Sequence, residues 1–294
     1  MSASTRRYGI VVGVDCSAAS YVAIGWAVDE AALRHIPLTL VHTVKAAEPV
    51  YPEMSLSADA AAWQEDEGRR VLEEAVKIAE DATKTSRKIA ISKELRVSPP
   101  VPTLAEMSGK AEMVVVGYNG RGAVGRVLLG SVSSSVVRSA RCPVAVIRAE
   151  APSLSHPEQA PVLVGIDCSP ASELALAIAF DEASRRGVEL TALHASGVEV
   201  LELPGLDWQA VKSEAERSLA EYLAGWQERY PDVKVNRLVV FDHPGRELIE
   251  GSKAAQLVVV GSHGRGGVTG MLLGSVSNAV VHSAHAPVIV ARPS

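Results

Sequence analysis

The sequence predicts an α/β fold of two tandem, doubly wound domains, each with a five-stranded parallel sheet, and two observations carry this prediction. The first is an internal repeat: residues 114–137 ("VVVGYNGRGAVGRVLLGSVSSSVV") and 258–281 ("VVVGSHGRGGVTGMLLGSVSNAVV") match at 16 of 24 positions with a constant offset of 144. The second is that short, almost wholly apolar runs alternate with helical patterns within each copy, which is typical of a parallel sheet covered on both faces.

The repeat also sets the expected domain boundaries. The run "IVVGVDCS" (10–17) returns as "VLVGIDCS" (162–169), and the proline-rich stretch "AEAPSLSHPEQAP" (149–161) separates the two copies. A chain of 294 residues has the length for two domains, and this stretch has the composition of an extended linker. We therefore expect domain one at 1–148, a linker at 149–160 and domain two at 161–294.

The elements of the first copy follow from periodicity and capping signals. Strands are expected at 8–14, 38–43, 89–97, 113–117 and 143–147, and helices at 17–35, about 71–82, 102–109 and 131–140. In the second copy the first helix has the clearest ends, with Ser169 as N-cap, Pro170 at the first helical position and Gly187 past the end. Trp63, Trp208 and Trp226 lie in helical patterns and are expected in core or interface packing.

Polar residues and glycines follow the carboxyl ends of these strands. Asp15 follows the first strand, His42 and Thr43 end the second, and Gly117 closes the fourth. In a doubly wound, Rossmann-like sheet, a ligand binds outside the carboxyl ends of the strands, where the winding direction reverses. If the first and fourth strands are neighbours there, Asp15 and Gly117 face one crevice. His42 and its repeat His194 are expected as hydrogen-bonded structural side chains, with a catalytic role as the alternative.

A glycine-rich loop follows the fourth strand in both copies, with the form G-x2-G-x9-G-S. Its members are Gly117, Gly120, Gly130 and Ser131, and Gly261, Gly264, Gly274 and Ser275. Glycine lets backbone amides approach an anion and permits positive φ. "GSVS" then opens a helix, whose first amides and dipole favour phosphate, and Ser131 and Ser133 can add hydroxyl donors. The alternative is a loop without a ligand, in which Ser131 caps the helix.

This pattern, with an aspartate closing the first strand, resembles the ATP-binding branch of the universal stress proteins. The resemblance covers the chain twice, apart from the linker and termini, and is to the tandem type of mycobacteria and other actinobacteria. It implies one adenine nucleotide site per domain, with ATP as the cofactor and Mg²⁺ left open. It also implies that subunits pair through the last strand, so two domains in one chain could form a pseudo-dimer, with a homodimer left open.

The resemblance also implies which residues form each site. Asp15 and Asp167 would contact the adenosine, and the backbone around Thr43 and Ala195 would flank the adenine. The first site would further contain Gly13, Gly117, Gly120, Gly130, Ser131, Val132 and Ser133, and the second Gly165, Gly261, Gly264, Gly274, Ser275, Val276 and Ser277. Many members have Ser or Thr and then His after the first glycine. The second copy follows this with Ser262 and His263, but the first has Tyr118 and Asn119, so we expect the second site to be tighter.

The sequence favours a nucleotide-dependent stress-response or regulatory module over an enzyme. It lacks the G-x4-G-K-[ST] lysine and a ready acidic pair for Mg²⁺, and its two loops share no general base, so we expect at most weak ATP hydrolysis. A slow ATPase or nucleotide-transfer enzyme is the alternative. A flavin or dinucleotide carrier is a third reading, weakened because the turn after the first strand reads "GVDCSAAS" and not G-x-G-x-x-G. Loop residues Arg121, Arg126 and Arg265 could contact phosphate or solvent.

Composition narrows the partners and the compartment. The net charge of −5 gives no reason to expect nucleic acid, and no apolar run approaches the roughly 18 residues of a membrane span. The charged N-terminus has no apolar stretch typical of a secretory leader. Cys16, Cys142 and Cys168 are expected as reduced thiols of a cytoplasmic protein. Cys16 and Cys168 are expected to be small buried side chains, with a redox sensor as the alternative. The protein partner is unknown.

Overall fold

A computed structural model describes residues 7–44, 58–84, 87–120, 129–150, 156–195, 207–264 and 273–293. The chain divides into two compact units, Met1–Ala149 and Glu150–Pro293, called here the first and the second unit. Within the expected linker, residues 151–155 lie outside the described residues, and a single 3-10 turn, η1 (Pro157–Gln159), comes just before the strands of the second unit.

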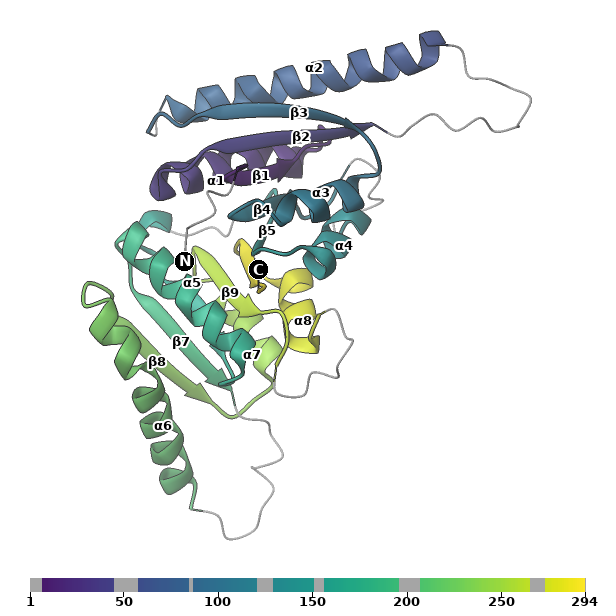
Figure 1. The fold of residues 1–294 in the computed structure, drawn as a ribbon. Helices are drawn as coiled ribbons and strands as arrows, with labels where there is room; N and C mark the ends of the chain where they lie inside the picture. The colour runs from purple at the N-terminus through teal and green to yellow at the C-terminus, as the bar shows by residue number, and fades with distance from the viewer. Residues whose placement is uncertain are drawn as a thin grey trace. The chain divides into compact units, whose positions relative to one another are not determined.

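Strands and helices alternate through both units (Figure 1). The first unit contains β1 (Ile10–Gly13), α1 (Ala18–Arg34), β2 (Leu38–Val44), α2 (Ala58–Thr83), β3 (Ile91–Val97), α3 (Pro100–Ser108), β4 (Met113–Gly117), α4 (Ser131–Ser139) and β5 (Val144–Ile147). The second unit contains β6 (Val162–Ile166), α5 (Pro170–Arg186), β7 (Leu190–Ala195), α6 (Trp208–Arg229), β8 (Val235–Val240), α7 (Pro244–Gly251), β9 (Leu257–Gly261), α8 (Ser275–Ser283) and β10 (Val288–Ala291).

Both units have the same doubly wound strand order, which confirms the predicted fold class. In the first unit the order is β3-β2-β1-β4-β5, and all neighbouring strands are parallel. In the second it is β8-β7-β6-β9-β10, again with parallel neighbours. The winding therefore reverses between β1 and β4, and between β6 and β9. At these two places the connections diverge to opposite faces and leave a crevice at the carboxyl ends of the strands.

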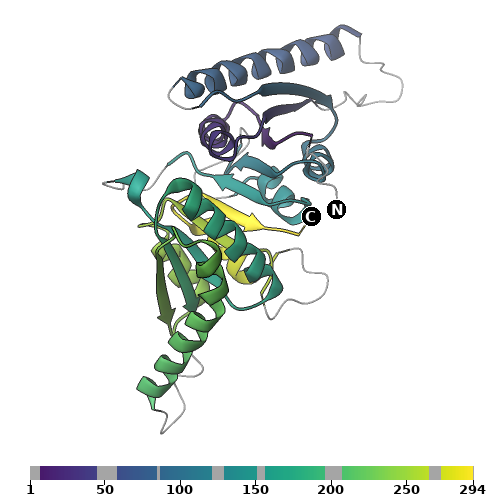
Figure 2. The ribbon, with the colours of Figure 1, turned by 60° about the vertical axis from the view of Figure 1, so that its left-hand side comes forward.

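Helices cover both faces of each sheet. In the first unit α1 packs with α2, and α3 packs with α4. Figure 2 shows the purple α1 end-on to one side of these strands and the blue α3 to the other. The central strands are therefore buried on both faces: every residue of β4 (MVVVG) and of β9 (LVVVG) is buried. This explains their continuous apolar sequences, because a strand with two covered faces does not alternate.

The first helix of each unit begins and ends where its sequence indicates. The Ser17 side chain accepts a hydrogen bond from the Ser20 amide, and Ser169 accepts one from Ser172, so both serines are N-caps as predicted. Gly187 ends α5 with a left-handed φ of 63°, a conformation in which glycine carries no steric cost. The sequence did not indicate that His35 takes the same conformation, with φ 57°, at the end of α1.

The long helix differs from its prediction in extent and in part of its packing. α2 begins at Ala58, well before the periodic segment that indicated it. Trp63 is 66% exposed, so it is not a core residue of its own unit. In the second unit, Trp226 does pack in a cluster, stacking on Phe180 and Tyr230 with ring centroids 5.8 Å and 6.5 Å away. The Trp208 side chain lies outside the described residues.

In the part of the chain that the structure describes, no helix is long and apolar enough to cross a membrane.

Candidate functional site

A pocket lies at the topological switch point of each unit. The first pocket has a volume of about 660 Å³ and the second of about 530 Å³, and both fall in the size range of small-molecule sites. The first is lined by all nine residues predicted for the first site, Gly13, Asp15, Thr43, Gly117, Gly120, Gly130, Ser131, Val132 and Ser133. The second is lined by all nine predicted for the other, Gly165, Asp167, Ala195, Gly261, Gly264, Gly274, Ser275, Val276 and Ser277. The fold thus brings together residues that are far apart in the sequence.

The aspartate after the first strand both builds the turn and faces the pocket. Asp15 Oδ1 accepts a hydrogen bond of 3.0 Å from the Ser17 amide, and Asp167 Oδ1 accepts an equal one from Ser169. This turn forces the intervening residue into the left-handed region, with φ 61° at Cys16 and 58° at Cys168. Cys16 is half-buried and Cys168 is exposed, so the expectation of two buried cysteines was wrong. Each lies in the turn that the neighbouring aspartate forms.

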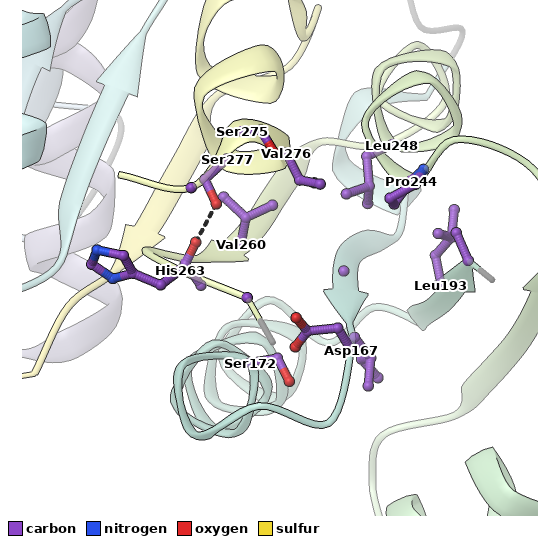
Figure 3. A pocket seen from close by; sticks show the side chains of 16 residues that line it. Asp167, Ser172, Leu193, Pro244, Leu248, Val260, His263, Ser275, Val276 and Ser277 are labelled. Carbon is purple, nitrogen blue, oxygen red and sulfur yellow. Dashed lines mark hydrogen bonds between the residues drawn. The ribbon is translucent and has the colours of Figure 1, made fainter. Parts of the chain in front are cut away.

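The second glycine of each loop lies against that aspartate. A Cβ placed on Gly120 would be 2.3 Å from Asp15 Oδ2, and one on Gly264 would be 2.5 Å from Asp167 Oδ2. Oxygen and carbon atoms cannot approach so closely without contact strain, so only glycine lets the loop backbone lie beside the carboxylate. Figure 3 shows the Asp167 carboxylate in the second pocket, below the start of α8. The loop glycine and the strand-end aspartate therefore form one side of the pocket together.

The first glycine of each loop has a different role from the second. Gly117 is buried at the end of β4, and a Cβ there would be 2.8 Å from the carbonyl carbon of Ala19 in α1. A Cβ on Gly261 would likewise be 2.8 Å from the carbonyl carbon of Ala171 in α5. Neither residue has a positive φ. These glycines let the first helix pack against the strand end, and the freedom to adopt positive φ is not the reason for their presence.

The helix after the loop begins without a side-chain cap. Gly130 is the N-cap of α4 and Gly274 that of α8, and no side chain caps either helix. The Gly130 amide donates to the Tyr118 carbonyl at 2.8 Å, which closes the loop at its base, and Gly274 donates to Ser262 in the same way. Ser131 is the first helical residue, so it does not act as the cap. The first amides of an α-helix have no intrahelical acceptor, and here the residues that carry them, Ser131, Val132 and Ser133, line the pocket.

The serine hydroxyl at the third helical position is already engaged. Ser133 Oγ donates to the Gly117 carbonyl at 2.6 Å, and Ser277 Oγ donates to Gly261 at 2.5 Å, a bond drawn in Figure 3. Both serines are only 5% exposed. The expectation that the Ser133 hydroxyl is a phosphate donor therefore needs correction, because this hydroxyl ties α4 to β4. Ser131 and Ser275 are exposed at the pocket and keep that role open.

The opposite wall is apolar, and sequence reasoning missed it. Leu104 of α3 packs over Gly13, where a Cβ would be 3.1 Å from Leu104 Cδ1, and Leu248 of α7 packs over Gly165 with 2.9 Å. Further wall residues come from the starts of these helices and from neighbouring strands, namely Pro100, Val41 and Val116 in the first pocket and Pro244, Leu193 and Val260 in the second. The proline-led start of the short helix in both copies was the available signal. Such a wall suits a planar, largely apolar group.

The two strand-end histidines are structural, as the sequence favoured. His42 Nδ1 lies 2.6 Å from the Val14 carbonyl oxygen, and His194 Nδ1 lies 2.9 Å from that of Ile166. A carbonyl only accepts, so Nδ1 carries the proton and donates in both cases. The bond joins β2 to the end of β1, and β7 to the end of β6. Each histidine therefore holds the strand ends that carry the aspartate.

The position after the first loop glycine differs between the units. Tyr118 is buried, and the Arg148 guanidinium lies over its ring at 3.7 Å from the centroid. The next residue, Asn119, accepts a hydrogen bond of 3.3 Å from Ser17 Oγ through its carbonyl. In the second unit, Ser262 Oγ lies 3.0 Å from His263 Nδ1. The loop entrance is thus held by different contacts in the two units.

Few charged groups reach the described part of either pocket. Asp15 is the one acidic residue among the described lining residues of the first pocket, and Asp167 among those of the second. Over the residues that the structure describes, no cluster of three or more potential metal ligands occurs. Arg121, Arg126 and Arg265 lie outside the described residues. What the described residues offer is unpaired helix amides for an anion, one carboxylate for hydroxyl groups and an apolar slot.

Comparison with known proteins identifies the family of this chain. The universal stress protein family matches residues 9–148 and again residues 160–292. The chain belongs to this family. A universal stress protein of Mycobacterium tuberculosis is 61% identical over 295 residues, which covers 100% of both chains. A second one from the same species is 52% identical and covers 100% of this chain and 99% of its own.

A solved structure of a universal stress protein supports the fold over both units. The protein from Archaeoglobus fulgidus superimposes with a TM-score of 0.71 at 20% sequence identity, covering 99% of this chain and 100% of its own. At that identity the similarity shows the fold alone. The two family matches and the mycobacterial relatives confirm the resemblance to a tandem universal stress protein that the sequence indicated.

Proposed function

We propose that this universal stress protein binds one adenine nucleotide, ATP, in the pocket of each unit, and that the bound nucleotide controls its action as a stress-response or regulatory module. The observation that supports this most is the convergence of the same positions in both pockets. An uncapped helix start, a strand-end aspartate and an apolar slot lie around one cavity, and this happens twice in one chain.

The parts of the nucleotide match the parts of the pocket. The triphosphate would lie at the first amides of α4, since unpaired amides and the helix dipole favour anions. The Asp15 carboxylate, beside the loop, would accept hydrogen bonds from the ribose hydroxyls. The adenine would lie in the slot formed by Leu104, Pro100 and Val41, near the backbone of Thr43. In the second unit, Asp167, α8 and Ala195 would do the same.

Binding without efficient turnover suits the described residues. Mg²⁺ commonly binds through one or two carboxylates together with substrate phosphates. Asp15 and Asp167 could each supply one such carboxylate, so an accompanying Mg²⁺ remains part of the proposal.

A regulatory module needs a ligand that changes its surface and a partner that binds the changed surface. The partner is expected to be a protein, because the net charge of −5 does not favour nucleic acid.

The cysteines bear on the compartment of the protein, and the two units bear on its assembly. None of the three cysteines forms a disulfide in the structure, which fits a reducing compartment, and we therefore propose a cytoplasmic protein. Each unit corresponds to one subunit in a dimer of single-domain relatives. We therefore propose that the two units form a pseudo-dimer within one chain. Whether the chain further pairs as a homodimer is tested by its mass in solution.

Calorimetry with conservative aspartate variants tests the binding proposal. We expect two ATP equivalents per wild-type chain, and we expect Asp15→Asn and Asp167→Asn each to weaken one of them. Asparagine can keep the turn because its side-chain oxygen also accepts from the backbone, while the negative charge is lost. Asp207→Asn is the matched control, since Asp207 caps α6 outside both pockets and asparagine caps equally well. Absence of ATP binding, or co-purification of a flavin in its place, would refute the proposal.

A further inference from the structure

We infer that Arg148, at the end of the first unit, positions the first nucleotide loop through the ring of Tyr118, and that nucleotide in the first pocket protects the chain at Arg148 from proteolysis. Arg148 is thus a positioning residue of the first site and links that site to the start of the linker. The inference rests on the proposed function, because it concerns the regulation of the same site.

Two neighbouring strands bring the arginine and the tyrosine together. Tyr118 directly follows β4 and Arg148 directly follows β5, and the Tyr118 amide donates to the Ile147 carbonyl at 2.7 Å. There the Arg148 guanidinium lies over the Tyr118 ring, with its central carbon 3.7 Å from the ring centroid. Tyr118 is 3% exposed. The ring is therefore largely removed from water, which strengthens its attraction for the cation.

The three residues that begin at Tyr118 each contact a different part of the first site. The Tyr118 carbonyl accepts a hydrogen bond of 2.8 Å from the Gly130 amide and so holds the N-cap of α4, where phosphate would bind. The Asn119 carbonyl accepts one of 3.3 Å from the N-cap serine of α1. Gly120 lies against the Asp15 carboxylate. A displacement of Tyr118 would therefore move the helix start and the aspartate side of the pocket together.

The second unit has the same backbone hydrogen bonds without the stacked ring. The Ser262 amide donates to the Ala291 carbonyl at 3.1 Å, and the Ser262 carbonyl accepts from the N-cap glycine of α8 at 2.8 Å. A serine offers no ring to Arg292, the residue at the position of Arg148. Ser262 Oγ lies 3.0 Å from Nδ1 of the adjacent His263. Binding should therefore depend on the arginine at the first site and not at the second.

Arg148 is also the place where the chain leaves the first unit, which ends at Ala149. A guanidinium that lies on the Tyr118 ring cannot enter the specificity pocket of trypsin, so cleavage after Arg148 requires the stack to open. The segment 149–161 contains no lysine or arginine, so trypsin has no other target there. When opening and closing are faster than cleavage, the cleavage rate follows the open fraction of the stack.

Nucleotide and stack should stabilise each other, because both need the loop base in one position. By thermodynamic reciprocity, the factor by which the stack raises nucleotide affinity is the factor by which nucleotide stabilises the stack. A guanidinium on an aromatic ring changes an equilibrium constant by a factor of about 2 to 30, from an exposed to a desolvated setting. Loss of the stack should weaken ATP at the first site by a factor in this range, and ATP should slow cleavage after Arg148 correspondingly.

Calorimetry of the full chain with ATP tests the effect of the stack on binding. In Arg148→Ala we expect one of the two ATP equivalents to weaken at least about twofold, and Arg148→Lys, which keeps a cation for the ring, to lose less. In an Asp167→Asn background the tight equivalent that remains belongs to the first site, and Arg148→Ala should weaken it. Arg141→Ala is the matched control, because Arg141 is exposed and bonds to Ser108 through its backbone amide.

Limited proteolysis with trypsin, followed by mass spectrometry, tests the reverse effect in the wild type. Saturating ATP should slow cleavage after Arg148 at least about twofold. Cleavage after Lys84 should not change, since this exposed residue follows α2 and precedes β3, at the edge of the sheet away from the carboxyl ends. In Tyr118→Leu, which keeps an apolar side chain but no ring, cleavage after Arg148 should be faster and no longer slowed by ATP. Urea titration checks the fold of each variant.

The possible outcomes separate the inference from the proposed function. Two ATP equivalents that are both unaffected by Arg148→Ala would overturn the inference and leave the function standing. The same holds if ATP binds but leaves cleavage after Arg148 unchanged, or slows it no more than cleavage after Lys84. If the wild type binds no ATP, the proposed function fails and the inference fails with it. Proteolysis of the wild type needs no substitution, so it decides even if a variant does not fold.

Discussion

Asp15 and Gly120 are in such close contact that the side chain of one excludes any side chain on the other. A Cβ on Gly120 would be 2.3 Å from Asp15 Oδ2, and the second unit repeats this relationship between Asp167 and Gly264 at 2.5 Å. Asp15 Oδ1 is meanwhile held by the Ser17 amide, so the carboxylate has little freedom to move. The lack of a side chain on Gly120 therefore leaves room for the Asp15 carboxylate at the place where this carboxylate faces the pocket.

Gly120→Ala is expected to remove one of the two nucleotide equivalents. The new methyl group must displace the Asp15 carboxylate or the loop, and we expect affinity at the first site to fall at least tenfold, or about 1.4 kcal/mol. Calorimetry with ATP measures the change. Gly25→Ala is the control, because a Cβ there meets nothing within 4 Å, and alanine within a helix stabilises by about 0.5–1 kcal/mol. Two unaltered equivalents in Gly120→Ala would show that Asp15 does not contact the ligand.

Gly117→Ala is expected to affect stability, in contrast with Gly120→Ala. Its Cβ would be 2.8 Å from Ala19 C and 3.0 Å from Ser20 N, which are backbone atoms of α1 that cannot rotate away. Overpacking of this kind costs about 1–3 kcal/mol. The free energy of unfolding from urea titration should fall by that amount, and Gly261→Ala should behave alike. An unchanged urea midpoint would mean that α1 can shift without cost.

The internal repeat and the alternation of apolar runs with helical patterns were enough to predict the fold class, and the resemblance to the universal stress proteins named residues that line both pockets. The sequence could not tell that Gly117 and Gly120 serve different purposes, because close approach depends on which backbone or side chain lies opposite. Leu104 was missed for a related reason. From the sequence, an apolar residue in a short helix is interpreted as a core residue, and only the structure shows that Leu104 packs over Gly13 in the pocket wall. Cys168 was expected to be buried because it is small and apolar, but the Asp167 turn places it at the surface.

Ser133→Ala and Ser131→Ala should separate stability from binding. Ser133 Oγ bonds to the Gly117 carbonyl inside the unit, so its removal should lower the free energy of unfolding by about 1–2 kcal/mol. Ser131 is exposed at the first turn of α4, and its removal should leave stability near the wild-type value while weakening ATP at the first site. Urea titration and calorimetry on both variants give the comparison. The reverse pattern would assign the phosphate contact to the Ser133 hydroxyl.

ATP hydrolysis by the purified chain should be slower than the roughly 1–100 s⁻¹ that is typical of kinases. Efficient phosphoryl transfer needs a cation on the β and γ phosphates and a group that orients the nucleophile. Among the described residues that line the first pocket, the charged side chain is Asp15, and His42 donates its Nδ1 proton to the Val14 carbonyl. Phosphate release with Mg²⁺ present measures the rate. The Gly120→Ala, Gly264→Ala double variant is the control, since hydrolysis that persists in it comes from a contaminant. Turnover within the kinase range that disappears in the double variant would show that residues outside the described part of the chain complete a catalytic site, and the protein would then act as an ATPase.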